Sequence, residues 1–228
     1  MQELPFPARG GQRKGAGRKR VGERPRVSHK PRPKLACRHP VLVTVRVRAG
    51  LPSLRRANSL HVLERAFAAG SERFGFRLIH YSVQSNHLHL IAEAHDEGAL
   101  ARGMKGLLVR ITRGLNRHWR RSGALVDDHY HARALKHPRE VRHALVYVLQ
   151  NARRHGVHVP GPDPFSSARG FDGWEHTEPR QEAASPPPVA SARTWLLTTG
   201  WRRHGLIGFE EHPARPASDQ GSGGRRRQ

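Results

Sequence analysis

The stretch SNHLHLIAEA, residues 85 to 94, constrains the fold more than any other part of the chain. Side chains on a β-strand point alternately to opposite faces. The pattern therefore predicts that His87 and His89 share one face, while Leu88 and Leu90 enter a core on the other. Two imidazoles on one rigid strand form half of a metal site. The chain has 17 histidines, however, and among so many a single His-x-His pair also arises by accident.

A second motif, ALVYVLQNARRHG at residues 144 to 156, supports the pair. Tyr147 and Asn151 are four residues apart on a predicted helix, which separates them by about 40° around its axis. This spacing places a nucleophile beside an oxygen ligand. Gln150 competes with Asn151 for the ligand role, but its angle carries it farther from the predicted buried stripe, so we favour Asn151.

The hydrophobic pattern predicts alternating strands and helices. We expect a ferredoxin-like α+β sandwich, in which an antiparallel sheet is covered by helices on one face. The predicted elements are a strand from His39, a helix capped by Asn58 or Ser59, strands over 76–84 and 87–94 joined by a turn at Ser85-Asn86, a helix capped by Asp96, a strand within 129–137 and a helix from Pro138.

The charge of the chain favours an anionic partner. Lys plus Arg number 41 against 18 acidic residues, which gives a formal net charge of +23. Such a charge opposes compaction unless an anion is nearby, and nucleic acid is the first candidate. A GC-rich genome would also raise the Arg content, although codon bias does not by itself remove acids from particular segments.

The cysteine and apolar content of the chain indicates the cellular compartment. Cys37 is the only cysteine, so we expect no disulfide framework and no cysteine-based zinc site. The chain has no apolar signal core and no run long enough to span a bilayer, so we expect a cytoplasmic protein without a membrane partner.

The N-terminal region is basic and poor in apolar residues. Residues 9–34 hold eleven Lys or Arg against the single acid Glu23, so they cannot bury enough surface to fold alone. The stretch GGQRKGAGRKR lacks the Gly-Lys-Ser/Thr ending of a phosphate loop, so we expect no nucleotide cofactor. We divide the chain into a basic DNA-binding arm at 1–38, a catalytic domain at 39–156, and a linker and tail at 157–228 with a docking segment at 194–211.

Three segments together resemble the HUH single-tyrosine transposases, and most closely their REP-associated branch. They are NHLHLI at 86–91, HYHARALKHPREV at 129–141 and YVLQNARRHG at 147–156. The resemblance implies that His87, His89 and Asn151 bind Mg²⁺ or Mn²⁺ and that Tyr147 is the nucleophile. It also implies a ferredoxin-like core, recognition of palindromic hairpins, and cleavage of single-stranded DNA through a 5′-phosphotyrosine. A bacterial, nucleoid-associated location follows from the same resemblance.

Tyrosine needs help in such a reaction. Its phenol is protonated near neutral pH, so it attacks poorly until its electrophile is activated or its proton is removed. A divalent metal that polarises the phosphate supplies this activation.

Three alternatives stand beside this interpretation. His129 and His131 form a second His-x-His pair around Tyr130, but no tyrosine and polar ligand follow them at helical spacing in their own right. Such transposases also carry a basic residue where His129 stands. The protein could instead be a hairpin-binding relative of a transposase that has lost cutting. A replication-initiating or conjugative nuclease fits less well, since the chain contains nothing that resembles a helicase.

Basic and aromatic side chains are candidates for contact with single-stranded or hairpin DNA, bound by a monomer or a homodimer. The aromatic candidates Trp119, Trp195 and Trp201 could stack on unpaired bases or pack in the core. The basic candidates are Arg18, Lys19 and Arg20 in the arm, Arg110, Arg113 and Arg117 on the long helix, and Arg202 and Arg203 near the C-terminus.

Deletion of residues 1–34 should weaken DNA binding and reduce the slope of log affinity against log salt concentration. The reason is that cations which contact phosphates release counterions, and the deletion removes such cations. Filter binding of a labelled hairpin at several salt concentrations measures both quantities. An unchanged slope would show that the arm does not contact phosphates.

Overall fold

A computed structural model of the chain describes residues 34–126, 129–154, 161–175 and 188–211. Contacts divide the chain into two units, residues 1–30 and 31–228, and all described residues lie in the second. The basic stretch that holds Arg18, Lys19 and Arg20 falls outside the described residues. Within the described ranges, no helix has both the length and the apolar character needed to cross a bilayer.

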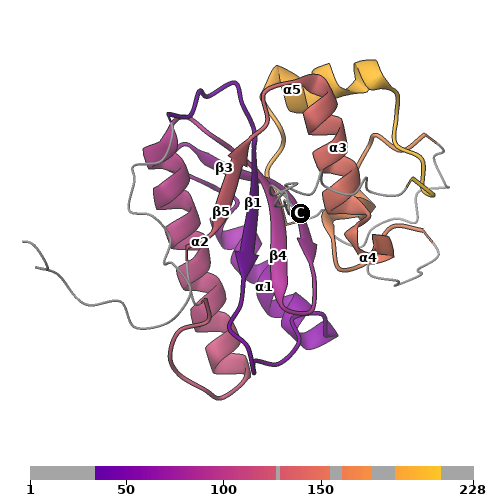
Figure 1. Cartoon of the computed structure of the whole chain (residues 1–228). Helices are drawn as coiled ribbons and strands as arrows, with labels where there is room; N and C mark the ends of the chain where they lie inside the picture. Colours follow the sequence, from indigo (N-terminus) through magenta and orange to yellow (C-terminus); the bar gives the residue numbers. More distant parts are fainter. Residues whose placement is uncertain (1–33, 127–128, 155–160, 176–187, 212–228) are drawn as a thin grey trace, which may run out of the picture. The chain divides into compact units, whose positions relative to one another are not determined.

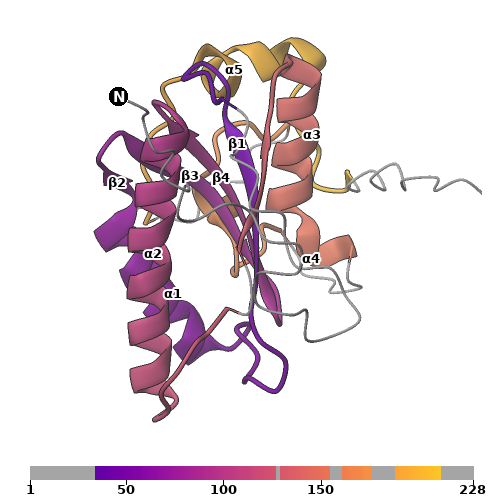
Figure 2. The same ribbon diagram turned by 60° about the vertical axis from the view of Figure 1, so that its left-hand side comes forward.

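Five strands form one antiparallel sheet in the order β2-β3-β4-β1-β5 (Figures 1 and 2). Ser85 and Asn86 form the predicted turn between β3 and β4, where the Gln84 amide donates to the His87 carbonyl at 2.9 Å. The strands are β1 (Val41–Arg46), β2 (Glu72–Arg73), β3 (Phe76–Val83), β4 (His87–Ala94) and β5 (His131–Ala134).

Helices α1 (Ala57–Gly70) and α2 (Glu97–His118) cover one face of this sheet (Figures 1 and 2). Leu88 and Leu90 enter the core on this face, as predicted, together with side chains such as Phe67 and Met104 from the helices. The sequence predicted the α+β fold and the antiparallel sheet, and both are confirmed.

The starts of α1 and α2 differ in how they are capped. The Asp96 carboxylate accepts a hydrogen bond from the Ala99 amide at 2.6 Å, which caps α2 as predicted. No side chain caps α1, whose N-cap residue is Arg56. The expectation that Asn58 or Ser59 caps this helix is therefore wrong. The helix begins earlier, since the Arg56 carbonyl already accepts from the Leu60 amide, and both residues lie in the first turn.

The opposite face of the sheet is also covered by a helix. Helix α3 (Pro138–Leu149) packs there, and the short α4 (Asn151–Arg154) follows it (Figure 2). The prediction of helices on one face alone thus needs correction. The physical reason is that β3 and β4 carry apolar side chains on both faces, and Ile79 and Ile91 form a second core with Leu145.

C-terminal segments complete this second layer. The 3-10 helices η1 (Ser167–Gly170) and η2 (Gly200–His204) and the short α5 (Trp195–Thr198) contribute buried side chains to the same core. The buried Glu93 carboxylate pairs with Arg77 and accepts from the amides of Arg193 and Thr194. Residues 194–211 thus dock on the sheet. Residues 161–175, expected to form part of a linker, also pack against it.

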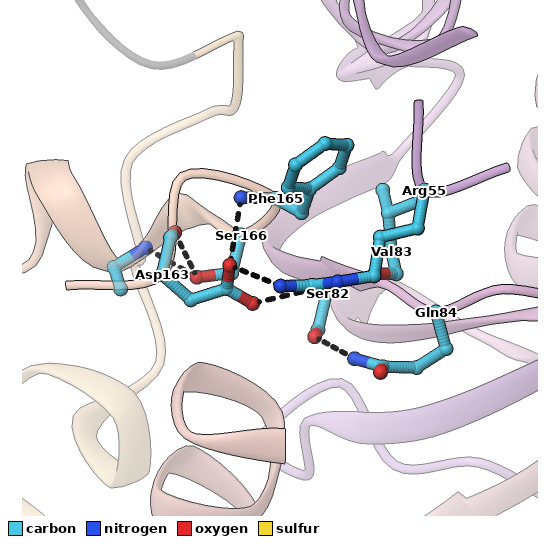
Figure 3. Close-up of polar contacts among 8 residues, drawn as sticks. Arg55, Ser82, Val83, Gln84, Asp163, Phe165 and Ser166 are labelled. Atoms are coloured by element: carbon cyan, nitrogen blue, oxygen red, sulfur yellow. Dashed lines mark hydrogen bonds and ion pairs between the residues drawn. The ribbon is translucent and has the colours of Figure 1, made fainter. Parts of the chain in front are cut away.

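Residues 163–167 lie along the free edge of β3. The Val83 amide donates to the Phe165 carbonyl at 2.8 Å. Arg55 reaches the same place from the loop before α1, where its guanidinium makes two bonds with the Asp163 carboxylate, at 2.8 and 2.9 Å (Figure 3). It also donates to the Val83 carbonyl. A strand edge that would otherwise be open is thereby covered.

The contact between His80 and Ser167 should make the folded state less stable in acid. Its Nδ1 lies 3.1 Å from the Ser167 hydroxyl, and burial lowers its pKa from 6.5 to about 4. The unfolded chain therefore binds a proton at higher pH than the folded chain does. The free energy of unfolding should fall as pH decreases from about 6.5, by up to about 1.4 kcal/mol per pH unit, and should level off below about 4.

Urea unfolding of the wild type and His80→Leu across this pH range measures the effect. The variant should lose this part of the pH dependence. Ser167 keeps its bond to the Tyr81 amide in the variant, so the fold should persist. The exposed His61 on α1 offers a control, because His61→Leu removes a histidine outside this contact and should retain the loss of stability at low pH. Equal slopes for wild type and His80→Leu would contradict the assignment.

Candidate active site

His87 and His89 lie on the face of β4 that α3 covers. In the pairing of β1 with β4, His87 stands opposite Arg46 and His89 stands opposite Thr44. Residues directly opposite each other in an antiparallel pair point to the same face. The two imidazole rings are 4.6 Å apart between centroids. The predicted sharing of one face by the two histidines is therefore what the structure shows.

Tyr147 reaches His89 from α3. Its hydroxyl oxygen lies 3.1 Å from His89 Nε2, and the two ring centroids are 4.7 Å apart. The helix is fixed in place by buried neighbours of Tyr147, including Leu145 and Val148. Tyr147 itself is part-buried at the edge of this core. The motifs at 86–91 and 147–156, far apart in sequence, thus meet at one point.

The second nitrogen of each imidazole contacts a neighbouring polar side chain. His87 Nδ1 lies 2.8 Å from Asn86 Oδ1, and since an amide oxygen only accepts, this nitrogen carries the proton. His89 Nδ1 lies 3.1 Å from Thr44 Oγ1. If Tyr147 donates to His89 Nε2, then Nδ1–H donates to Thr44. Each neutral imidazole then has a lone pair on Nε2, the form in which histidine binds a metal.

Asn151 and Gln150 differ in how their amides are used. Helix α3 ends at Leu149, and Asn151 starts α4, so the two residues are not on one continuous helix with Tyr147. The break occurs because Gln150, with φ −115° and ψ 18°, leaves helical geometry. Gln150 Nε2 donates to the Gly208 carbonyl at 2.7 Å. Asn151 is fully buried, and neither atom of its amide has a hydrogen-bond partner among the described residues.

The second His-x-His pair does not form an equivalent site. His131 starts β5 and pairs with Thr44, so it shares the face of His89, with β1 between them. Tyr130 packs against the core on the face of α1 and α2. The side chains of His131 and Tyr130 are thus directed to opposite faces of the sheet. Among the described residues, no three His, Cys, Asp or Glu side chains group as metal ligands.

The predicted DNA-binding residues that the structure describes are spread over separate surfaces. Arg113 and Arg117 are exposed on α2, across the sheet from Tyr147, while Arg110 donates to the Gly106 carbonyl of its own helix. Arg202 pairs with Asp172 at 2.8 Å. Arg203 is exposed. The structure therefore does not bring these cations together with the histidines.

The tryptophans fall into different environments. Trp201 is 1% exposed and belongs to the core beneath α3, so it cannot stack on a base. Trp195 is 48% exposed, with the Arg203 guanidinium 4.9 Å from its ring. Trp119 is part-buried at the end of α2. The last two remain available for contact with a base.

Sequence reasoning missed Thr44 and Arg46. Both lie on β1 opposite the two histidines, and the exposed Arg46 places a cation next to His87. The sequence did contain a signal for these two residues, because Thr44 and Arg46 occupy alternate positions of the strand VLVTVR. It could be interpreted only once the strand order was known.

The fold is also found in a known protein. No family model and no curated protein sequence matches the chain. A solved structure of a REP-associated tyrosine transposase bound to a REP hairpin matches with a TM-score of 0.51 and 17% identity. The match covers 62% of this chain and 82% of that one. The two proteins share a fold. It is the fold that the resemblance in the sequence motifs implies, and at this identity the match shows the fold alone.

Thr44→Val should disturb His89 more than His87. The substitution keeps the shape of the side chain but removes the oxygen next to His89 Nδ1, so a buried N–H would lose its acceptor, at a cost of about 1–3 kcal/mol. We expect the Nδ1–H tautomer of His89 to lose population in ¹⁵N-edited NMR spectra.

Thr44→Ser is the matched control, since it retains the hydroxyl and should keep the wild-type tautomer. His87 serves as an internal reference, because its Asn86 partner is untouched. An unchanged His89 signal in Thr44→Val would mean that this hydroxyl does not set the tautomer.

Proposed function

We propose that the protein is a metal-dependent endonuclease and strand transferase that cleaves single-stranded DNA next to hairpins, as a transposase does. The observation that carries the proposal is the contact between the Tyr147 hydroxyl and His89 Nε2, at 3.1 Å, within the HUH-type pair. The shared fold with a transposase solved on a hairpin supports it.

Mg²⁺ or Mn²⁺ is the cofactor we propose, held by His87, His89 and Asn151. The fit rests on the donors that the chain offers. Both imidazoles have Nε2 as their second nitrogen, which in His89 now contacts the Tyr147 hydroxyl, and the buried Asn151 amide has no partner among the described residues. A buried amide without a hydrogen bond is costly, so a ligand for its oxygen is expected. Gln150 Oε1 also has no partner among the described residues, but Gln150 is the weaker candidate because its Nε2 already donates to the Gly208 carbonyl. When bound, the metal supplies Lewis-acid polarisation of a phosphate oxygen.

In this mechanism the Tyr147 oxygen attacks the phosphorus of a bound phosphodiester. The bond from phosphorus to the 3′ oxygen breaks, and the 5′ side stays linked as a phosphotyrosine. The phenol loses its proton, and the 3′ oxygen leaves and is protonated to a free hydroxyl. The energy of the phosphodiester is retained in the new link, so a 3′ hydroxyl of another strand can later attack it and reseal the DNA. No nucleotide cofactor is required for this sequence.

Charge and exposed aromatics support DNA as the substrate. The net charge of +23 favours a polyanion. We propose that Arg113 and Arg117 on α2 and the Trp195–Arg203 pair contact the strand or the stem. Arg46 stands opposite His87 and is suited to contact a phosphate at the site.

A second candidate function is hairpin binding without cleavage. One observation favours it: the described residues contain no group of three His, Cys, Asp or Glu ligands, so the metal would depend on an amide. The two candidates differ in one product, the covalent adduct between the protein and DNA.

Tyr147→Phe should abolish the covalent adduct and leave DNA binding nearly unchanged, since only a hydroxyl is removed. Hairpin DNA with a labelled single-stranded flank, Mn²⁺ and a denaturing gel detect the adduct. Metal affinity, measured by calorimetry with Mn²⁺, should not fall, because the lost hydroxyl contacts the Nε2 atom that a metal would take.

Tyr130→Phe is the matched control and should form the adduct like the wild type, because Tyr130 packs on the opposite side of the sheet. An adduct that persists in Tyr147→Phe would refute the nucleophile. Binding of several hairpins by the wild type without any adduct would favour the non-cleaving protein instead.

A further inference from the structure

A pocket of about 270 Å³ lies between the start of α1 and the end of α2. It is separate from the contact between Tyr147 and His89. Its lining includes Arg56, Asn58, Ser59, His118 and Trp119. No acidic side chain is among the described residues that line it. The residues that line the pocket therefore suit a ligand that combines an anionic group with a flat ring.

The start of α1 offers uncapped donors to this pocket. Arg56 is the N-cap residue, no side chain caps the helix, and the first turn contains no acid. The first turn of a helix has free amide N–H groups and a partial positive charge. Phosphate groups bind at such termini in many proteins. The helix is 14 residues long, so its dipole is fully developed.

Ser59 provides an independent indication of a ligand. It lines the pocket, is 1% exposed, and its hydroxyl has no hydrogen-bond partner among the described residues. Buried hydroxyl groups in proteins are nearly always paired, because an unpaired one loses its bonds to water without replacement. A phosphate oxygen at the start of α1 would supply the missing acceptor.

The remaining lining residues suit a nucleotide rather than a bare anion. Arg56 and His118 are exposed, Trp119 is part-buried, and all three line the pocket. Arg55, the neighbour of Arg56, is held by Asp163 and the Val83 carbonyl instead (Figure 3). An aromatic ring next to a phosphate site is the arrangement by which proteins bind unpaired bases.

The pocket is connected to the strand that carries the histidines. The loop before α1 bonds to the turn ahead of His87, with the Leu54 amide donating to the Ser85 carbonyl at 2.8 Å. The Val47 amide likewise donates to the Asn86 carbonyl at 2.9 Å. The loop that leads into the pocket residues of α1 thus contacts the turn at the start of β4.

We infer that this pocket binds one phosphate of a single-stranded nucleic acid at the start of α1, with the adjoining unpaired base against Trp119. The ligand class in this inference, a single-stranded nucleic acid, rests on the proposed function. The inference does not depend on cleavage. The pocket positions the strand outside the cleavage centre.

Asn58→Asp tests the inference in the full-length protein. The new carboxylate lies in the first turn of α1, where it should stabilise the helix while it repels a phosphate. We expect the affinity for a labelled oligothymidine strand, too short to form a hairpin, to fall roughly tenfold in fluorescence anisotropy. Ala101→Asp is the control, because it makes the same charge change at an exposed position on α2 and should bind like the wild type.

Trp119→Leu tests the base contact. Loss of one stacked base should weaken binding by about tenfold or more, whereas Trp119→Phe should keep most of the affinity. Thermal unfolding checks that the variants fold, and if Trp119→Leu does not, the comparison of Asn58→Asp with Ala101→Asp decides alone. Equal affinities for Asn58→Asp and Ala101→Asp would overturn the inference.

The same samples, given hairpin DNA and Mn²⁺, separate this inference from the proposed cleavage. An adduct with Tyr147, together with equal binding by Asn58→Asp and Ala101→Asp, would refute the pocket and leave cleavage standing. Weaker binding by Asn58→Asp without an adduct in any sample would support the pocket and refute cleavage.

Discussion

The antiparallel pairing of β1 with β4 is the constraint on which the rest of the structure depends. Its register sets Thr44 opposite His89 and sends Leu88 and Leu90 to the other face. A shift by one residue would exchange the two faces, burying the imidazoles against α1 and α2. The core that holds the sheet together therefore also fixes which side carries the histidines. Stability and site geometry are set by one register.

Buried charges connect the C-terminal segments to this sheet. Glu93 binds Arg77 and two backbone amides, and Asp163 binds Arg55, so each carboxylate has several partners. Removing one partner of such a pair costs about 3–5 kcal/mol, while the pair itself adds less to stability. We interpret these polar contacts as the ones that determine where residues 161–175 and 188–211 lie on the sheet. The second core then adds apolar contacts to these segments.

The sequence was sufficient for elements whose pattern is local. The hydrophobic pattern predicted β1, β3 and β4, Ser85-Asn86 predicted the turn, and Asp96 predicted the start of α2. It failed where long-range packing decides. Glu93 and Asp163 look like surface acids in the sequence, and only their distant partners make them buried. In the sequence, Trp201 resembled a base-stacking residue because it precedes Arg202 and Arg203. In the structure, its ring is buried in the core beneath α3. Asn151 was predicted as a metal ligand from helical spacing. In the structure, the support for that role is instead its buried amide, which has no hydrogen-bond partner among the described residues.

The contact between Tyr147 and His89 has a consequence for the proposed chemistry. An imidazole nitrogen has one lone pair, so Nε2 of His89 can accept the Tyr147 hydroxyl or bind a metal, but not both at once. Metal binding in the proposed site would therefore release the hydroxyl from His89. The released oxygen would stay on α3, whose packing against the sheet would hold it near the proposed metal ligands. In this arrangement the proposed cofactor and nucleophile would be coupled through one atom, and the tyrosine would be freed for attack when the group that activates the phosphate is present.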